Sequence, residues 1–257
     1  MLRYEYKYLV PISMLDQLRG LLRPFTELDR HAAENGGEYT VRSIYFDTQD
    51  LECYFMKLAG VKRRNKVRLR GYNLEADGNP VFFEIKKKVD EPLFKNRAAM
   101  SFEAARSILR GEPLEDFVQP SRKLPEAVNN ARRFMYHIHA RNMRPVVAVI
   151  YEREPYQGLF KDRDNNLRIT FDKNLRGVAH PALDDLFEEQ YAHPVDNRHF
   201  ILEVKFNLYL PGWVKAITAS LNLKKGPASK YVMCIESNPE ILSGKGQVIS
   251  SSRQMTG

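Results

Sequence analysis

The stretch Lys66 to Arg70 reads K-V-R-L-R and alternates a basic side chain with an aliphatic one at every position. Successive side chains of a β-strand point to opposite faces, so this alternation predicts a strand from Lys66 to Tyr72 with a cationic face and an apolar face. A second strand is predicted from Pro80 to Lys88, where Glu84, Lys86 and Lys88 lie opposite Phe83 and Ile85, with Lys87 as an exception at the end of the run. These two segments indicate an antiparallel sheet with one face rich in charge.

Other segments have the same strand-like character. They lie at Tyr4 to Val10, Thr40 to Asp47, Val146 to Arg153, Leu167 to Asp172 and Phe200 to Asn207, with shorter candidates at Phe94 to Met100 and Lys230 to Cys234. Helices are predicted from a Ser13 cap to Arg23, from Ser101 to Gly111, from Pro125 to about His139, and after Pro211 with Trp213 inside. The order lacks the regular strand-helix alternation of a parallel sheet, which favours an α+β fold with a closed or nearly closed antiparallel sheet.

The polar faces of these strands are mostly cationic and contain almost no Ser, Asn or Gln. Their charged residues are eight cations, Lys7, Lys66, Arg68, Arg70, Lys86, Lys88, Arg168 and Lys205, and four carboxylates, Glu5, Glu84, Asp172 and Glu203. One interpretation is that each polar face meets solvent, as in most half-exposed antiparallel strands. The other is that the charged faces line a tunnel.

A tunnel lined with like charges requires a polyanion, because the charges repel more strongly in a medium less polar than water. A phosphate chain fits, since Arg binds phosphate oxygens bidentately and Lys supplies point charges. The scattered carboxylates would then hold Mg²⁺ or Mn²⁺ together with phosphate oxygens.

Composition agrees with an anionic partner without choosing one. The 257 residues contain 40 Lys and Arg against 32 Asp and Glu, a net charge of +8, which leaves nucleic acid, acidic membranes and phosphorylated small molecules open. Cys53 and Cys234 have no spacing typical of a zinc site or a disulfide framework. No apolar run approaches the roughly 18 residues of a membrane span. We therefore expect a soluble, unprocessed, cytoplasmic protein.

Several motifs, in their order and spacing, resemble the VTC (vacuolar transporter chaperone) polyphosphate polymerase domain, a branch of the triphosphate tunnel metalloenzymes that also include the CYTH proteins. The segments are R-Y-E-Y-K-Y at 3–8, S-I-Y-F-D-T at 43–48, K-V-R-L-R at 66–70, F-E-I-K-K-K at 83–88, K-N-R at 95–97, R-P-V-V-A-V-I-Y-E-R at 144–153, L-R-I-T-F-D at 167–172, L-E-V-K at 202–205 and S-K-Y at 229–231.

The resemblance implies an eight-stranded antiparallel β-barrel with helices packed outside, spanning residues 1–243. The polar composition of residues 244–257 predicts a mobile tail. The basic tunnel of the barrel would hold ATP, or another triphosphate, and inorganic polyphosphate. The implied phosphate ligands are Lys7, Arg68, Arg70, Lys86, Lys95, Arg97, Tyr151, Arg153, Arg168, Lys205 and Lys230. Glu203, Arg153 and Lys230 would be catalytic, with Glu203 and Glu5 as ligands of Mn²⁺ or Mg²⁺.

One departure bears on which branch the chain resembles. The wider superfamily begins with E-x-E-x-K, and here Arg3 replaces the first Glu. This favours the polymerase branch over the triphosphatases, which use several Glu residues to hold metal. The chain shows no SPX regulatory domain and no membrane segments, so it resembles the stand-alone bacterial form; a membrane partner stays open.

The expected reaction is attack of a polyphosphate end on the γ-phosphate of ATP. With water as the attacker, the same site would be a triphosphatase. A catalytically idle polyphosphate sensor is a third hypothesis, in which Glu203 only forms an ion pair with Lys205. A nucleic-acid-binding module is not expected, because the chain shows no recognised motif or exposed basic-aromatic interleaving.

Other residues are predicted to be structural. Tyr45 and Phe46 are assigned to the core, Asp47 to a turn or cap, and Trp213 to anchoring its helix. His137 and His139 lie two positions apart on a predicted helix and therefore on different faces, so no metal site is expected there.

Overall fold

The computed structural model describes residues 3–75, 78–88, 93–159 and 165–243. It has ten strands: β1 (Tyr4–Pro11), β2 (Thr26–Leu28), β3 (Tyr39–Asp47), β4 (Arg64–Tyr72), β5 (Val81–Lys88), β6 (Leu93–Met100), β7 (Arg144–Gly158), β8 (Arg168–Ala179), β9 (His193–Asp196) and β10 (His199–Phe206). The α-helices are α1 (Leu15–Leu22), α2 (Arg30–Ala33), α3 (Glu52–Leu58), α4 (Phe102–Leu109), α5 (Ala127–Ala140), α6 (Gly212–Ser220), α7 (Lys230–Glu236) and α8 (Pro239–Leu242). The fold is therefore α+β, as predicted.

The strands form one antiparallel sheet whose hydrogen-bonded order is β1-β10-β8-β7-β3-β4-β5-β6, with β2 paired to β7 and β9 to β8. Within the described residues this order is open, from β1 at one end to β6 at the other. The eight-stranded closed barrel is thus not confirmed. The short strands β2 and β9 account for the larger strand number, because three or four residues show no readable alternation.

The chain divides into two compact units. The first comprises Met1–Val41, Ile150–Arg176 and Pro194–Lys230, and the second comprises Arg42–Val149, Gly177–His193 and Tyr231–Gly257. The single domain predicted over residues 1–243 stays a prediction, and the predicted tail at 244–257 lies outside the described residues.

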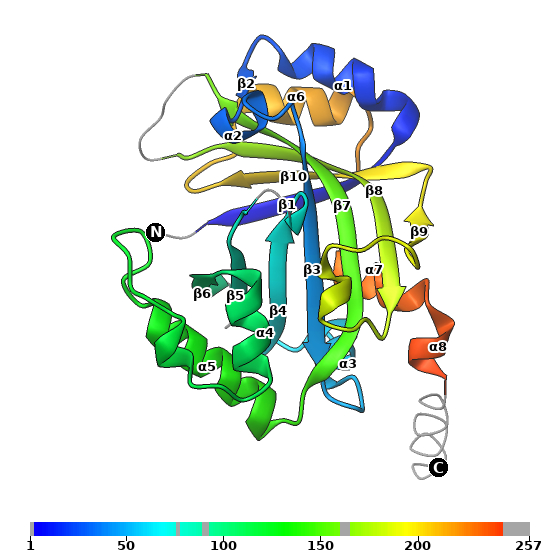
Figure 1. Cartoon of the computed structure of the whole chain (residues 1–257). Coiled ribbons are helices and arrows are strands. Elements are labelled where there is room, and N and C mark those ends of the chain that lie inside the picture. The colour runs from blue at the N-terminus through cyan, green and yellow to red at the C-terminus, as the bar shows by residue number, and fades with distance from the viewer. Residues whose placement is uncertain (1–2, 76–77, 89–92, 160–164, 244–257) are drawn as a thin grey trace. The chain divides into compact units, whose positions relative to one another are not determined.

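In the first unit, α1 and α6 cover one face of β1, β10 and β8 (Figure 1). Leu18 of α1 and Ile217 of α6 enter a core that contains Phe171 of β8 and Phe200 of β10. Trp213 stacks on Phe25 with ring centroids 4.6 Å apart, so it anchors α6 as expected. The apolar faces of these strands therefore face helices, which leaves the charged faces on the other side.

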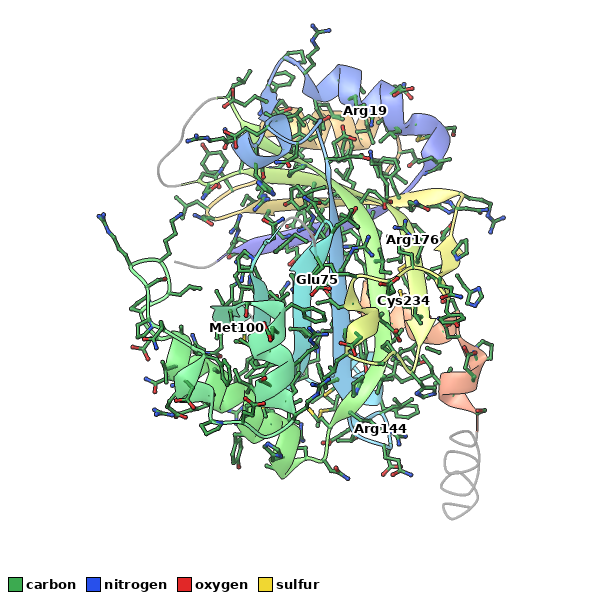
Figure 2. All side chains as sticks on the ribbon, viewed as in Figure 1. Arg19, Glu75, Met100, Arg144, Arg176 and Cys234 are labelled. Carbon is green, nitrogen blue, oxygen red and sulfur yellow. The ribbon has the colours of Figure 1, made fainter. Side chains whose placement is uncertain are left out.

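Ion pairs also fix α1 in the first unit. Arg19, labelled in Figure 2, donates to both oxygens of Glu154 on β7, with Nε at 2.9 Å and Nη2 at 2.6 Å. Lys173 Nζ lies 2.8 Å from the same carboxylate, and the Tyr156 hydroxyl also donates to it. Burial alone would raise the pKa of Glu154, but these hydrogen bonds lower it to about 2.

In the second unit, α4 and α5 pack beside β5 and β6 (Figure 1). Phe134 of α5 stacks on Phe83 of β5 with ring centroids 4.2 Å apart and planes 4° apart. Asn130 of α5 donates to the backbone oxygen of Arg97 and accepts from the Asn96 side chain, at 3.1 and 2.8 Å. These contacts hold α5 firmly on the apolar face of the two strands.

A side-chain cap and a glycine set the two ends of α4. Ser101 caps α4 by accepting from the Ala104 N–H at 3.1 Å, and Gly111 follows the helix with a φ of 107°. Ser13 was wrongly predicted as a cap, since it lies inside a 3₁₀ turn and α1 begins after Met14 without a side-chain cap.

The prediction of a strand from Lys230 to Cys234 is also wrong, because this segment begins helix α7. Tyr231, Cys234 and Ile235 are fully buried, and their i, i+3, i+4 spacing is that of one helix face. A short apolar run fits both the two-residue period of a strand and the 3.6-residue period of a helix, which explains the error. No helix in the described part of the chain is long and apolar enough to cross a membrane.

Candidate functional site

The β1–β10 pair in the first unit gathers four charged side chains. Lys7 lies opposite Glu203, and Glu5 lies opposite Lys205. Residues two apart share a face of the strand, so the four side chains form one patch. The alternate residues of both strands enter the apolar core, which fixes this register.

Glu203 is at the centre of the patch and only 4% exposed. Its Oε2 accepts from Lys205 Nζ at 2.6 Å, and its Oε1 accepts from Lys230 Nζ at 2.9 Å. Lys7 Nζ lies 3.2 Å from Oε1, and Arg153 Nη2 lies 3.5 Å from Oε2. Burial alone would raise the pKa of Glu203, but Lys205 and the other cations hold it well below its usual value.

Asp172 supplies a second buried carboxylate. Lys230 Nζ lies 2.5 Å from its Oδ2, so this ammonium bridges Asp172 and Glu203. The two carboxylates more than offset burial and raise the pKa of Lys230. The ring of Tyr151 faces two of the cations, with its centroid 4.7 Å from Lys230 Nζ and 5.3 Å from Arg153 Cζ.

We call this group the Glu203 cluster. Its members are the carboxylates Glu5, Asp172 and Glu203 and the cations Lys7, Arg153, Lys205 and Lys230. Among the described residues of the first unit it therefore has one more cation than carboxylate. Burial, together with Arg153, lowers the pKa of Lys205 despite Glu203 beside it. The ion pair of Glu203 with Lys205, which the sequence left open, is present.

Arg168 is a predicted phosphate ligand of the first unit that pairs with residues outside the Glu203 cluster. It lies opposite Lys205 in the β8–β10 register. Its guanidinium nevertheless donates to Asp29 Oδ2 at 2.9 Å and to the Tyr39 hydroxyl at 3.3 Å. Asp29 also caps α2 through the Ala32 N–H, so this interaction orders the start of α2.

The second unit contains a separate charged face on β4, β5 and β6. Lys66, Lys86 and Lys95 lie opposite one another across the three strands. Two residues along, Arg68, Glu84 and Arg97 form the next cross-strand row. Together with Arg70, these residues form what we call the β4–β6 cationic face.

Glu84 is the carboxylate of this face and is fully buried. Arg68 donates Nε and Nη2 to its Oε2 at 2.9 and 2.6 Å. Lys95 Nζ and Arg97 Nε lie 2.8 and 3.0 Å from Oε1, and Arg70 Nη1 lies 3.9 Å from Oε2. Burial would raise the pKa of Glu84, but the four cations hold it well below its usual value.

The guanidinium groups are also held by neutral side chains. Arg68 Nη1 donates to the Tyr45 hydroxyl at 2.7 Å, and Arg97 Nη2 donates to the Tyr72 hydroxyl at 3.1 Å. Sequence reasoning placed Tyr45 in the core, which is correct, but missed this hydrogen bond. The available signal for this bond was a tyrosine hydroxyl, an acceptor for Arg, on a strand predicted to lie in the same sheet as the arginines.

Charge is poorly balanced on the β4–β6 cationic face. Six cations stand against one carboxylate among the described residues that define it. Like charges directly opposite one another on a sheet are destabilising. The row of Lys66, Lys86 and Lys95 places three ammonium-bearing side chains at that spacing. Such a face is suited to a ligand with several negative charges.

Comparison with known families shows the family of this chain. The model of the VTC domain matches residues 2–238. The chain belongs to the VTC domain family. A curated relative is subunit 4 of the vacuolar transporter chaperone complex from Schizosaccharomyces pombe (strain 972 / ATCC 24843), which is 28% identical over 148 residues. That alignment covers 52% of this chain and 20% of the relative, so this VTC domain matches about a fifth of the relative's length.

Ten of the eleven expected phosphate ligands of this VTC domain fall into two sets, and Arg168 belongs to neither. Lys7, Tyr151, Arg153, Lys205 and Lys230 gather in the first unit, and Arg68, Arg70, Lys86, Lys95 and Arg97 share one face in the second. Asp172 was counted among the charged strand residues but was given no role. Its position in β8 indicated the face, whereas its partners come from β7 and α7, which are distant in sequence.

The fit of a divalent metal to this VTC domain depends on its carboxylates. Within the described part of the chain, no group of three His, Cys, Asp or Glu side chains is placed to hold a metal ion. Both oxygens of Glu203 face cations. Mg²⁺ commonly uses one or two carboxylates and takes its other ligands from substrate phosphates and water. Glu203 and Glu5 therefore stay predicted metal ligands, and Glu203 would bind a metal only after phosphate displaced cations from its carboxylate.

Proposed function

We propose that this chain is a metal-dependent polyphosphate polymerase that transfers the γ-phosphate of ATP to a growing polyphosphate chain. The observation that supports it most is the β4–β6 cationic face, which carries six cations and one carboxylate, with four of the cations around Glu84. A linear phosphate chain has one negative charge or more on each unit, so it offsets this excess along its length.

Arginine geometry supports phosphate as the ligand. The Arg68 guanidinium is already oriented by Glu84 and the Tyr45 hydroxyl, so little side-chain entropy is lost when phosphate binds. Arg97 is held in the same way by Glu84, by Tyr72 and by the Phe82 ring, 3.4 Å from its Cζ. Orientation of this kind contributes to positioning of the reacting groups.

The Glu203 cluster is proposed to hold the reacting phosphates. Lys7, Lys205 and Lys230 would move their hydrogen bonds from Glu203 to phosphate oxygens, which frees the carboxylate. Glu203 and Glu5 would then bind Mn²⁺ or Mg²⁺. The metal would neutralise charge that develops on the transferred phosphoryl group.

The reaction needs no strong base, because the attacking oxygen belongs to an anionic terminal phosphate. A bond forms between this oxygen and the γ-phosphorus, and the bond from that phosphorus to the β–γ bridging oxygen breaks. The electron pair stays on the oxygen of ADP. Arg153 and Lys230 would stabilise the charge that moves to the leaving group.

The direct test incubates the purified chain with Mn²⁺ and ATP and measures long-chain polyphosphate, ADP and free phosphate separately. Polymer formed with ADP supports the polymerase, whereas free phosphate with ADP and no polymer replaces it with a triphosphatase. The control is Arg110→Gln, which removes an exposed cation of α4's C-terminal cap and should leave the products unchanged.

A polyphosphate sensor is a second candidate. It is favoured by the near balance of charge in the Glu203 cluster, where every oxygen of Glu203 already faces a cation. Such a cluster can be stable without a metal. Tight polyphosphate binding with no product of either kind in the same incubation would select the sensor.

A further inference from the structure

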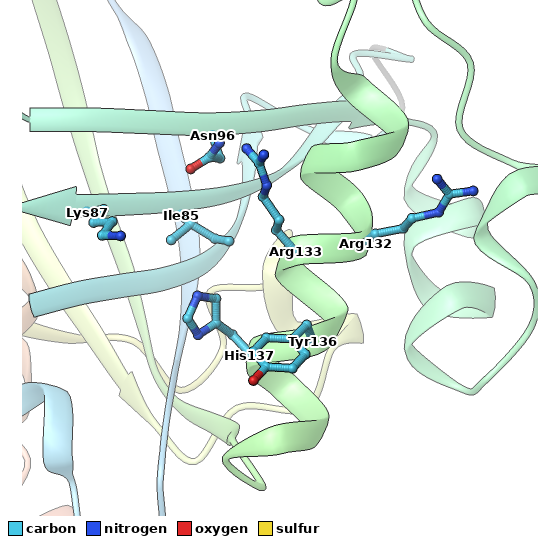
Figure 3. A pocket seen from close by; sticks show the side chains of 7 residues that line it. All are labelled: Ile85, Lys87, Asn96, Arg132, Arg133, Tyr136 and His137. Carbon is cyan, nitrogen blue, oxygen red and sulfur yellow. The ribbon is translucent and has the colours of Figure 1, made fainter.

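A pocket of about 400 Å³ lies on the second unit, on the face of β5 and β6 that α5 covers. Its walls include Ile85 and Lys87 of β5, Asn96 of β6, and Arg133 and His137 of α5 (Figure 3). Ile85 and Lys87 alternate with Glu84 and Lys86 along β5, so they point to the opposite face. The pocket is therefore separate from the β4–β6 cationic face.

The pocket has cations without matching carboxylates. Arg133 and His137 point from α5 toward the strands, whereas Arg132 points away (Figure 3) and binds Glu115 at 2.9 and 3.0 Å. Within the described residues, neither Lys87 nor Arg133 has a carboxylate partner, and no Asp or Glu lines the pocket. Lys87 is also the residue that broke the strand alternation in the sequence.

His137 adds a buried polar atom that has no partner. Among the described residues, nothing forms a hydrogen bond with its Nδ1, although this atom is buried. Burial, with Arg141 and Lys87 nearby, lowers the pKa of His137 and keeps the imidazole neutral at pH 7. A neutral ring with its proton on Nδ1 can donate to a ligand oxygen, and such a bond removes the cost of an unpaired buried group.

The strands and the helix that line the pocket are packed against each other. Phe83 of β5 stacks on Phe134 of α5, and Asn96 of β6 bonds to Asn130 of α5 at 2.8 Å. Tyr136 is 68% exposed at the edge and offers a ring for stacking. The volume lies within the range of small-molecule sites, roughly 300 to 1,000 Å³.

We propose that this pocket binds a diphosphate group, with Lys87 and Arg133 on its oxygens and His137 donating a further hydrogen bond. Two cations and one neutral donor match an anion with two adjacent phosphates, since Arg binds phosphate bidentately and Lys binds it as a point charge. The group can belong to inorganic pyrophosphate or to a nucleoside diphosphate whose base stacks on Tyr136.

The test is calorimetric titration of the full chain with pyrophosphate and, separately, with ADP, both without metal. The wild-type chain should show a site that Lys87→Gln with Arg133→Gln weakens at least about tenfold, the loss expected from hydrogen bonds to charged groups. Arg110→Gln with Arg144→Gln removes the same charge from exposed positions outside the pocket and should change nothing. Equal binding by the wild-type chain and the Lys87/Arg133 variant overturns the proposal.

A third variant separates this site from the proposed polymerase site. Lys95→Gln with Arg97→Gln alters the β4–β6 cationic face, and it should retain the binding that the Lys87/Arg133 variant loses. Loss of that binding in the Lys95/Arg97 variant would also contradict a separate pocket. Tighter binding of ADP than pyrophosphate, abolished by Tyr136→Ala, assigns the site to a nucleotide; equal affinity assigns it to the inorganic ion.

Discussion

Arg153 and Asp172 form a bidentate ion pair, with Nε 2.7 Å from Oδ1 and Nη2 2.7 Å from Oδ2. Asp172 is only 1% exposed, and Lys230 binds the same carboxylate. Asp172 therefore holds two of the expected catalytic cations of the Glu203 cluster in place.

Replacement of Asp172 by Asn should lower the free energy of unfolding by about 3 to 5 kcal/mol, because it leaves buried cations without their partner. Urea unfolding measures the change. Asp16→Asn is the control, since Asp16 forms an exposed pair with Arg19 and should cost less than about 1 kcal/mol. Equal stability of the Asp172 variant and wild type would show that Glu203 alone compensates Arg153 and Lys230.

Glu154 should give the first unit a defined acid sensitivity. Its pKa in the folded chain is about 2, below the unfolded value of about 4.3. Its contribution to the free energy of unfolding is therefore fully present above about pH 5. The contribution is lost as the pH falls from about 4.5 to 2, and it amounts to about 3 kcal/mol at neutral pH.

The measurement is the unfolding free energy of the wild-type chain and Glu154→Gln between pH 7 and pH 2. The difference between the two proteins should shrink as the pH falls through this window. Glu34→Gln removes an exposed carboxylate paired with Arg30 and should show little difference at any pH. A difference that stays constant down to pH 2 would contradict the lowered pKa.

Glu203→Gln should lower the turnover rate at least about 100-fold, which raises the reaction barrier by roughly 2.7 kcal/mol. Binding of the phosphate chain should be largely retained. The amide keeps the size of the side chain but removes the charge that a metal requires. Initial rates with Mn²⁺ and ATP, and binding of tripolyphosphate without metal, measure the two properties. Glu188→Gln, on an exposed side chain, is the control. Unchanged turnover would remove Glu203 from its proposed role.

Arg97→Lys should weaken tripolyphosphate binding about tenfold although the charge is kept. The Lys ammonium cannot reproduce the planar guanidinium of Arg97, which pairs with Glu84, donates to the Tyr72 hydroxyl and packs over Phe82. Calorimetric titration measures the affinity, with Arg110→Lys as the control. Full affinity in the Arg97 variant would mean that this residue contributes charge alone.

The sequence predicted the cationic face well, because strand alternation alone places Lys66, Arg68 and Arg70 together. It predicted the position of Glu203 beside Lys205 for the same reason. Alternation does not indicate partners that are distant in the chain, so Asp172 received no role and the ion pair of Arg168 with Asp29 was not predicted. Such pairings depend on the tertiary packing of strands and loops.

Two further features could not be predicted from the sequence. Lys230 was placed in a strand because the apolar run after it is too short to distinguish a period of 2 from one of 3.6. The pocket beside His137 requires knowledge of which strand face α5 covers, which only the contacts of Phe134 and Asn130 reveal.

The most direct test of the account is a crystal structure of the chain with Mn²⁺ and a non-hydrolysable ATP analogue. We expect phosphate oxygens of the analogue at hydrogen-bonding distance, about 3 Å, from Lys7 and Lys230 of the Glu203 cluster, and Glu203 released to the metal. A triphosphate bound elsewhere, with Lys7 and Lys230 still contacting only protein atoms, would contradict the proposal.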